Sequence, residues 1–344
     1  MGPFIAAALL LAMPDRCGSP DGGAPPHHYV FFREEHDRIA DTSFLQHPAL
    51  AGAQLTYTWR ALEPTPGNYA FDGIRARLAF LAAHGKRLFL QLQDVSFSER
   101  IVTPDYLRTD PAYHGGIARK YERGADDTVP FEGWIARRWD PAVRVRFALL
   151  LQALAREFDG RIEGIVLAET AVGFDDPARQ PDGFSPEAYA AGIRETLSAA
   201  RKAFQRSCVV LYANFMPGES LPEDDHGYLR GVHAHAAAIG AGVGGPDVLP
   251  LRPWQRRHSL PLIERRAPGV VAGMAVQDGN LADRDRATGE RITVAALYAF
   301  ATERLRLDYL FWGTEEPYFS EEVLPFLRAP SITPPRRTPP GSTP

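Results

Sequence analysis

The chain has 344 residues, of which 45% are hydrophobic, which is enough for one large core. Its formal net charge is -4 at pH 7 with the charged residues scattered along the sequence, so no basic surface for nucleic acid is expected. The two cysteines, Cys17 and Cys208, exclude a disulfide framework and cannot build a zinc site by themselves.

The first residues predict an export signal. Residues 4–13 form an apolar run of signal-peptide length that is too short to span a bilayer, although no basic residue precedes it. We therefore expect a leader and linker over residues 1–26 and a periplasmic or extracellular protein, or a cytoplasmic one if the segment is not a signal. Residues 330–344 are rich in Pro, Thr and Arg and predict a disordered tail.

Short apolar runs alternate with helical patterns between these two ends. The expected strands are residues 28–33, 53–59, 86–92, 162–167, 208–214, 242–249, 270–276 and 308–312. The expected helices follow at residues 74–81, 141–158, 186–204, 226–239, 254–266, 293–304 and 321–327, with Asp140 as the N-cap and Pro141 as the first residue of the second. Eight alternating strands predict a single-domain (β/α)8 TIM barrel over residues 27–329, with right-handed parallel crossovers.

The long segment 96–140 contains no clear buried run. It carries several aromatic residues, among them Tyr113, Tyr121, Trp134 and Trp139. Long loops in compact domains are usually functional or disordered, and the aromatic content favours an ordered loop that faces a substrate.

Glu169 stands at the end of the fourth expected strand, just beyond the apolar run 162–167. An ionisable side chain at the C-terminal end of a buried parallel strand is where barrel enzymes place their chemistry. Glu169 is therefore the first candidate for a catalytic residue. The alternative is a structural role, in which Glu169 forms an ion pair with Arg60.

Polar residues at the other strand ends converge with Glu169 if the barrel forms. They are Glu34, Glu35, Trp59, Arg60, Gln91, Gln93, Asp94, Asn214, Asp247, Gln277, Asp278, Trp312, Glu315 and Glu316. This set contains no histidine, which argues against a His-rich zinc centre and a Ser-His-Asp triad, and no glycine-rich phosphate loop is present. Carboxylate pairs with aromatic side chains are typical of glycosidic bond cleavage, which requires neither a metal nor an organic cofactor.

The block after the second strand carries a family resemblance. It runs Tyr57-Thr-Trp59-Arg60-Ala-Leu-Glu63-Pro64-Thr-Pro66-Gly67-Asn-Tyr69-Ala-Phe71-Asp72. A tryptophan, then Glu-Pro, then Gly-x-Tyr-x-Phe before a helix resembles the second-strand block of clan A glycoside hydrolases. The resemblance implies the barrel architecture over residues 28–328, a glutamate acid/base at the fourth strand, a glutamate nucleophile at the seventh, and a tryptophan on the eighth. Glu169 matches the fourth position and Trp312 the eighth.

Two departures from the family pattern concern the catalytic pair. Ala168 stands where the family usually has Asn before the acid/base glutamate, and the seventh strand ends in Gln277-Asp278 where the family has a glutamate. We expect Asp278 to be the second carboxylate and Glu316 to be its competitor. Asp278 also lies in an Asp-Gly-Asn context that is ordinary turn chemistry.

The sequence thus predicts a glycoside hydrolase acting on a poly- or oligosaccharide, with Glu169, Asp278 and Glu316 as catalytic candidates. Residues expected to bind the sugar are Trp59, Arg60, Gln91, Gln93, Asn214, Asp247, Gln277 and Trp312; for both tryptophans a core position is the alternative, and Glu63 is expected to anchor its own Pro-rich turn. A rival is a non-catalytic carbohydrate-binding barrel of an exopolysaccharide pathway. Another is a lyase or isomerase with a divalent metal bound by Glu34, Asp94, Asp247 and Asp278.

Overall fold

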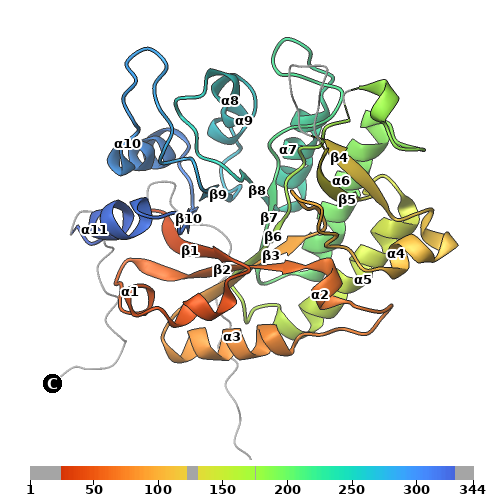
Figure 1. Cartoon of the computed structure of the whole chain (residues 1–344), viewed down its shortest axis with the longest axis horizontal. Helices are drawn as coiled ribbons and strands as arrows, with labels where there is room; N and C mark the ends of the chain where they lie inside the picture. Colours follow the sequence, from red (N-terminus) through yellow and green to blue (C-terminus); the bar gives the residue numbers. More distant parts are fainter. Residues whose placement is uncertain (1–24, 122–130, 175, 330–344) are drawn as a thin grey trace, which may run out of the picture.

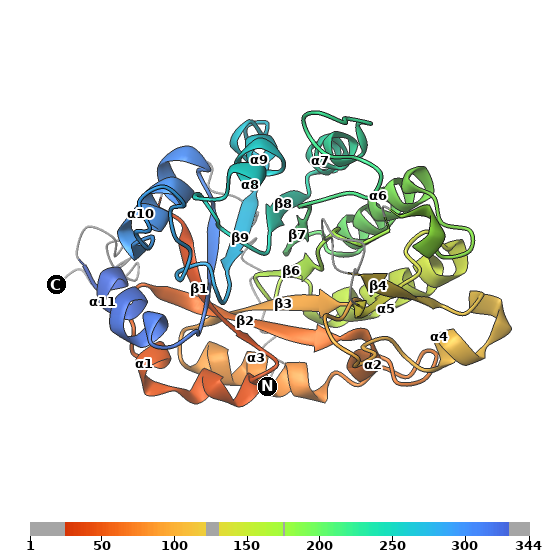
Figure 2. The same cartoon turned by 45° about the horizontal axis from the view of Figure 1, so that its top comes forward.

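The computed structural model describes residues 25–121, 131–174 and 176–329. The predicted tail, and the predicted leader apart from its last two residues, lie outside the described residues. Eight parallel strands close into a barrel in the order β1-β10-β9-β8-β7-β6-β3-β2. The predicted (β/α)8 barrel is therefore confirmed, and Figures 1 and 2 show the strands at its centre with the helices around them.

The barrel strands match the predicted apolar runs closely. They are β1 (His27–Arg33), β2 (Leu50–Thr58), β3 (Arg87–Gln93), β6 (Gly164–Leu167), β7 (Cys208–Tyr212), β8 (Gly242–Gly245), β9 (Ala272–Val276) and β10 (Tyr309–Gly313). Consecutive barrel strands are neighbours, and β10 pairs with β1 to close the ring. All eight C-terminal strand ends therefore open on one face of the barrel, where (β/α)8 enzymes place their active sites.

The helices that follow the strands differ widely in length. They are α1 (Thr42–Leu45), α2 (Trp59–Leu62), α3 (Asp72–Ala83), α4 (Tyr106–Thr109), α5 (Pro141–Phe158), α6 (Pro186–Ala203), α7 (Tyr228–Ile239), α8 (Pro253–Arg257), α9 (Leu260–Glu264), α10 (Val294–Ala299) and α11 (Leu324–Leu327). The predicted cap of α5 is confirmed, since the Asp140 carboxylate accepts hydrogen bonds from the backbone N–H groups of Ala142 and Val143. No helix within the described ranges is long and apolar enough to cross a membrane.

The segment 96–140 is more structured than the predicted loop. It contains α4, the 3-10 helix η2 (Pro111–Tyr113) and an antiparallel hairpin of β4 (Ile117–Tyr121) and β5 (Phe131–Ala136). The hairpin is tied to the end of β3, because the Ser96 N–H donates to the Trp134 carbonyl at 2.7 Å. The hairpin therefore lies at the face of the barrel where the C-terminal strand ends open.

Alternation along the strands divides the apolar residues between two clusters. Aromatic rings fill the barrel interior, where Phe89 contacts Tyr29, Tyr309 and Phe311 with ring centroids 5.0–5.1 Å apart. These rings need space, and Gly164 provides it, since a Cβ there would lie 2.4 Å from the Phe89 ring. The interior is thus a packed core below the face formed by the C-terminal strand ends.

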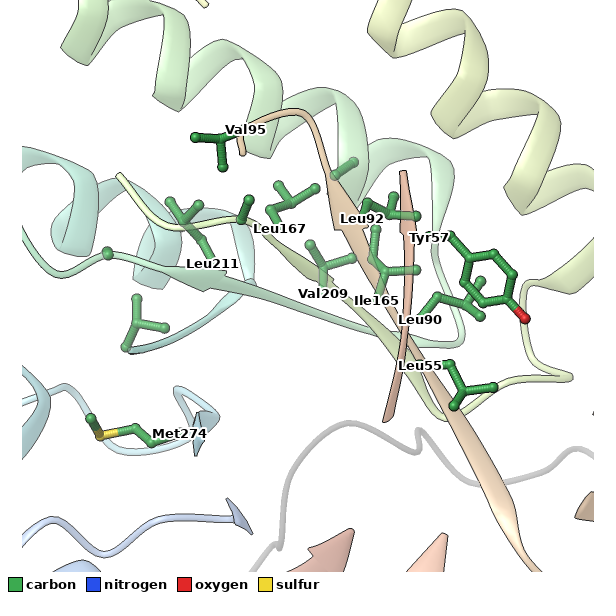
Figure 3. Close-up of a cluster of buried hydrophobic side chains, with 14 of the residues drawn as sticks. Leu55, Tyr57, Leu90, Leu92, Val95, Ile165, Leu167, Val209, Leu211 and Met274 are labelled. Carbon is green, nitrogen blue, oxygen red and sulfur yellow. The ribbon is translucent and has the colours of Figure 1, made fainter. Parts of the chain in front are cut away.

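The outward strand positions form the larger cluster under the helices. Figure 3 shows Leu90 and Leu92 of β3 beside Ile165 of β6 and Val209 and Leu211 of β7. Buried side chains of α5 such as Leu150 and Leu154 belong to the same cluster. Cys208 is fully buried in the inner cluster, where its Sγ lies 3.6 Å from the Tyr309 hydroxyl, and it has a packing role.

His28 makes the stability of the barrel sensitive to acid. It is 2% exposed, and its Nδ1 accepts a hydrogen bond from Trp312 Nε1 at 3.1 Å. Burial lowers the pKa of His28 from 6.5 to about 3. Between pH 6.5 and 3 His28 is protonated in the unfolded chain and neutral in the folded chain. The free energy of unfolding is therefore unaffected by His28 above pH 6.5 and decreases as the pH falls toward 3. We expect His28 to reduce the free energy of unfolding by about 1.4 kcal/mol for each pH unit below 6.5.

Chemical denaturation of the wild type and of His28→Gln between pH 7 and 5 measures this contribution. The variant should show the shallower pH dependence, and His84→Gln, at an exposed histidine, is the control substitution. Equal slopes in His28→Gln and the wild type would contradict the assignment.

Candidate active site

A cavity of about 410 Å³ opens among the C-terminal strand ends. Its size falls in the range of small-molecule sites. The inward-facing positions of the strands lead from the core directly to it, as in Phe89, Gln91 and Gln93 along β3. The polar and charged residues that line it are Arg33, Glu34, Thr56, Gln91, Gln93, Ser96, Ser98, Arg100, Glu169, Tyr212 and Gln277.

Glu169 is half-buried and lines this cavity at the end of β6. Asn214, which follows β7, donates from Nδ2 to Glu169 Oε2 at 2.6 Å. The ion pair with Arg60 that was the structural alternative does not form, because the Arg60 guanidinium binds Asp105 through two hydrogen bonds. Glu169 therefore has an oriented carboxylate at the position predicted for the proton donor.

Asn214 is itself held in one orientation. Its Oδ1 accepts the backbone N–H groups of Ala171 and Phe215, at 3.2 and 3.0 Å. A flipped amide would turn its NH2 group toward these two donors, so the network leaves only the Nδ2 group for Glu169. Asn214, predicted to bind sugar hydroxyls, is in this structure a positioning residue for Glu169.

A buried ion pair fixes the backbone of Glu169. Arg138 is 6% exposed, and its guanidinium binds the Asp94 carboxylate through Nε at 2.8 Å and Nη2 at 2.6 Å. Its Nη1 donates to the Glu169 carbonyl at 2.6 Å, while the hydroxyl of Tyr189 donates to the Thr170 carbonyl. Burial alone would lower the pKa of Arg138, but the Asp94 charge outweighs it and raises the pKa. Asp94 is thus a structural partner of Arg138.

The second carboxylate at the cavity is Glu34, which follows β1. Arg100 donates from Nη1 to both Glu34 oxygens, at 2.7 and 2.9 Å. Glu34 and Glu169 are the two acidic residues among the described ones that line the cavity. Their side chains come from strands on different sides of the barrel, the first and the fourth.

At the end of the seventh strand Gln277 lines the cavity, whereas Asp278 lies at the rim. Asp278 is 47% exposed and binds Arg33 Nη1 at 2.7 Å. Arg33 has a φ of 55°, a left-handed conformation that costs a non-glycine residue about 1–2 kcal/mol, and the pairing of β1 with β2 shifts register there. Because Asp278 is paired with Arg33 outside the lining, the residue of the seventh strand end that faces the cavity is the uncharged Gln277.

Glu316 and Glu315 are engaged by hydrogen-bond donors of the segments after β10 and β9. The Glu316 carboxylate accepts hydrogen bonds from the Ser320 N–H at 3.2 Å and from its hydroxyl at 2.5 Å, while Glu315 accepts the Gly279 N–H at 2.8 Å. Neither residue lines the cavity. Glu316 thus has the geometry of a residue that stabilises the turn after β10.

The two tryptophans predicted as sugar platforms are core residues, which corrects that prediction. Trp59 is 1% exposed, contacts Phe147 and donates from Nε1 to Glu63 Oε2 at 3.0 Å. Trp312 is fully buried and belongs to the outward-facing cluster, because the alternation along β10 turns Phe311 into the barrel and Trp312 toward the helices. Glu63 anchors its turn as predicted, accepting the Gly67 N–H at 2.8 Å.

The remaining predicted sugar-binding residues divide between the cavity and its surroundings. Gln91 lines the cavity and accepts a hydrogen bond from the Thr56 hydroxyl at 2.7 Å, and Gln93 lines it one inward position further on. Asp247 accepts a hydrogen bond from Asn280 at 2.8 Å and lies outside the lining; burial raises its pKa more than that hydrogen bond lowers it. Arg60 is also outside the lining, held by Asp105.

Several lining residues were missed from the sequence. Phe97 is 47% exposed and gives the cavity an aromatic wall, with Lys120 Nζ 4.1 Å from its ring centre. Arg33 and Arg100 add two guanidinium groups. The aromatic content of segment 96–140 was the available signal for Phe97, whereas nothing in the sequence near Arg100 indicates its contact with Glu34.

Three of the four acidic residues predicted to bind a divalent metal each form an ion pair with a different arginine. Asp94 binds Arg138, Asp278 binds Arg33, and Glu34 binds Arg100. Within the described residues, no group of three or more His, Cys, Asp or Glu side chains is arranged to hold a metal ion.

Solved structures with a similar fold are glycoside hydrolases of several families. A family 5 enzyme (GH5_18) from Streptomyces cattleya, solved with GlcNAc, has a TM-score of 0.52 and 15% identity, with 84% of this chain and 71% of that chain covered. A GH10 protein from Paenibacillus barcinonensis has a TM-score of 0.51 and 16% identity, with 91% and 97% covered. A family 39 glycoside hydrolase from Bacteroides cellulosilyticus has a TM-score of 0.50 and 13% identity, and this chain spans 56% of its length.

The predicted resemblance to clan A glycoside hydrolases is thus confirmed at the level of the fold. No protein-family model matches the sequence, and no curated protein matches it significantly. The chain thus shares the barrel fold of these enzymes at only 13–16% sequence identity.

Proposed function

We propose that this protein is a glycoside hydrolase in which Glu169 donates the proton to the leaving-group oxygen. The observation that carries the proposal is the Glu169 carboxylate at the end of the fourth strand, lining a cavity and held by Asn214 at 2.6 Å. The similar fold of glycoside hydrolases from three families supports a carbohydrate substrate. Gln91, Gln93 and Gln277 would bond the sugar hydroxyls, and Phe97 would contact a sugar face.

Glu34 is our first choice for the second carboxylate, since it lines the cavity. Asp278, the sequence-based choice, becomes available if its exposed pair with Arg33 opens, and such pairs are worth only about 0–1 kcal/mol. Glu316 would first have to leave Ser320. Glu34→Gln and Asp278→Asn, compared on the same substrate, separate the choices: the catalytic carboxylate is the one whose amide loses activity.

A non-catalytic carbohydrate-binding barrel is the second candidate. The observation that favours it is Gln277, an amide that cannot act as nucleophile or base, at the end of the seventh strand.

A screen of poly- and oligosaccharides tests both candidates. Wild type and Glu169→Gln are incubated with each glycan, and new reducing ends and retained binding are measured side by side. Hydrolysis predicts new reducing ends with the wild type only. Binding by both proteins without new reducing ends would select the non-catalytic barrel.

A further inference from the structure

A second cavity, of about 550 Å³, lies outside the barrel and is lined by residues of α7, α8 and α9. The reason for it is visible in the helix lengths: α8 and α9 have 5 residues each, whereas α5 and α6 have 18. Beside these two short helices the cavity extends to the outer side of β8, whose residues are themselves buried. The glycine-rich strand β8 offers Val243 as the side chain that reaches this space. We call this cavity the α7–α9 groove.

The charges around the α7–α9 groove are all of one sign. Its lining contains Arg230, Arg256, Arg257, Arg265 and Arg266, and none of its described lining residues is acidic. Three of these arginines have acidic partners outside the groove, Asp225, Glu223 and Asp308. The other two, Arg256 and Arg265, are exposed and form no ion pair with any described residue. Arg256 and Arg265 are therefore the two guanidinium groups of the lining whose charge no described acidic residue balances, and an anion between them would supply the counter-charge.

The floor of the groove is apolar. It is formed by short aliphatic side chains such as Leu221, Ala237, Leu262 and Val270. An apolar floor favours burial of hydrocarbon, and guanidinium groups favour phosphate, sulfate or carboxylate through paired N–H donors. One class of ligand satisfies both conditions.

We propose that the α7–α9 groove binds an anionic amphiphile, in which a phosphate, sulfate or carboxylate head meets Arg256 and Arg265 and an apolar body covers the floor. This site is separate from the cavity at the strand ends. It therefore adds a ligand site to the proposed hydrolase and does not depend on that activity.

Isothermal titration with dodecyl phosphate below its critical micelle concentration tests the proposal. The test variant is Arg256→Gln/Arg265→Gln, and the matched control is Arg286→Gln/Arg328→Gln, which removes the same charge from exposed arginines outside the groove. We expect the wild type and the control to bind alike and the test variant to bind at least about 10-fold more weakly. Thermal unfolding of both variants should match the wild type, since all four arginines are exposed.

Two further probes separate the head from the body of the ligand. Inorganic phosphate carries the head alone, and pentaethylene glycol monododecyl ether carries the same chain with an uncharged head. Both should bind at least about 10-fold more weakly than dodecyl phosphate, because each uses half of the site. Equal affinity for either probe, or equal affinity of test variant and control for dodecyl phosphate, would overturn the proposal.

Discussion

Replacement of Arg138 by methionine is expected to lower the free energy of unfolding by about 3–5 kcal/mol. Arg138 and Asp94 are both buried, and the guanidinium satisfies both carboxylate oxygens. Methionine fills a similar volume but leaves the Asp94 charge in the core without a counter-charge. The Glu169 carbonyl loses its hydrogen-bond donor as well, so the variant should weaken the geometry of the site together with the fold.

Chemical denaturation measures this loss, and Arg60→Met provides the matched control. Arg60 also makes a two-bond ion pair with an aspartate, but its side chain is 38% exposed and that of Asp105 is 56% exposed. An exposed pair contributes about 1 kcal/mol or less. Similar losses in both variants would show that the Arg138–Asp94 pair is no more important than a surface pair.

Replacement of Glu169 by glutamine is expected to reduce kcat by about 10²- to 10⁴-fold on any glycan that the wild type cleaves. Glutamine keeps the shape and can still face Asn214, but it cannot donate the catalytic proton. KM should change little, because the lost interaction is made in the transition state. Glu303→Gln is the control, since Glu303 is exposed and lies outside the cavity lining. An equal loss of kcat in Glu303→Gln would contradict the assignment of Glu169 as the proton donor.

The barrel could be predicted from the sequence because each of its signals is local. The apolar run 162–167 has the length of a buried strand, and Asp140 followed by Pro141 marks a helix start wherever the chain goes next. Once eight such runs are counted, the parallel topology brings Glu169, Gln91, Gln93 and Gln277 to one face. Their position at the cavity follows from the fold alone.

The direction of individual side chains could not be predicted in the same way. Trp59 and Trp312 stand near strand ends, but one is drawn into the core by the turn of α2 and the other lies on the outward face of its strand. The phase of alternation decides such cases, and a shift of one residue reverses it. Asp278 shows the same effect, since Gln277 takes the inward position and leaves Asp278 at the rim.

Contacts between distant segments could not be predicted from the sequence either. Arg100 binds Glu34 across 66 residues, and Arg138, just before α5, reaches the Glu169 carbonyl 31 residues later in the chain. The hairpin of β4 and β5 lacks a clear apolar run, so only its aromatic residues indicated order. These long-range contacts and the hairpin distinguish the cavity of this chain from the strand-end face that every (β/α)8 barrel has.

The most direct test of Glu169 as the proton donor varies the leaving group. Once the screen has identified the sugar, wild type and Glu169→Gln are compared on the natural glycan and on the 2,4-dinitrophenyl glycoside of the same sugar. Dinitrophenolate leaves without a proton. The kcat/KM of the variant on this substrate should therefore stay within about 10-fold of the wild-type value, while its kcat/KM on the glycan should fall by about 10²- to 10⁴-fold. Equal fractional losses on both substrates, or no loss on the glycan, would contradict the assignment of Glu169 as the acid.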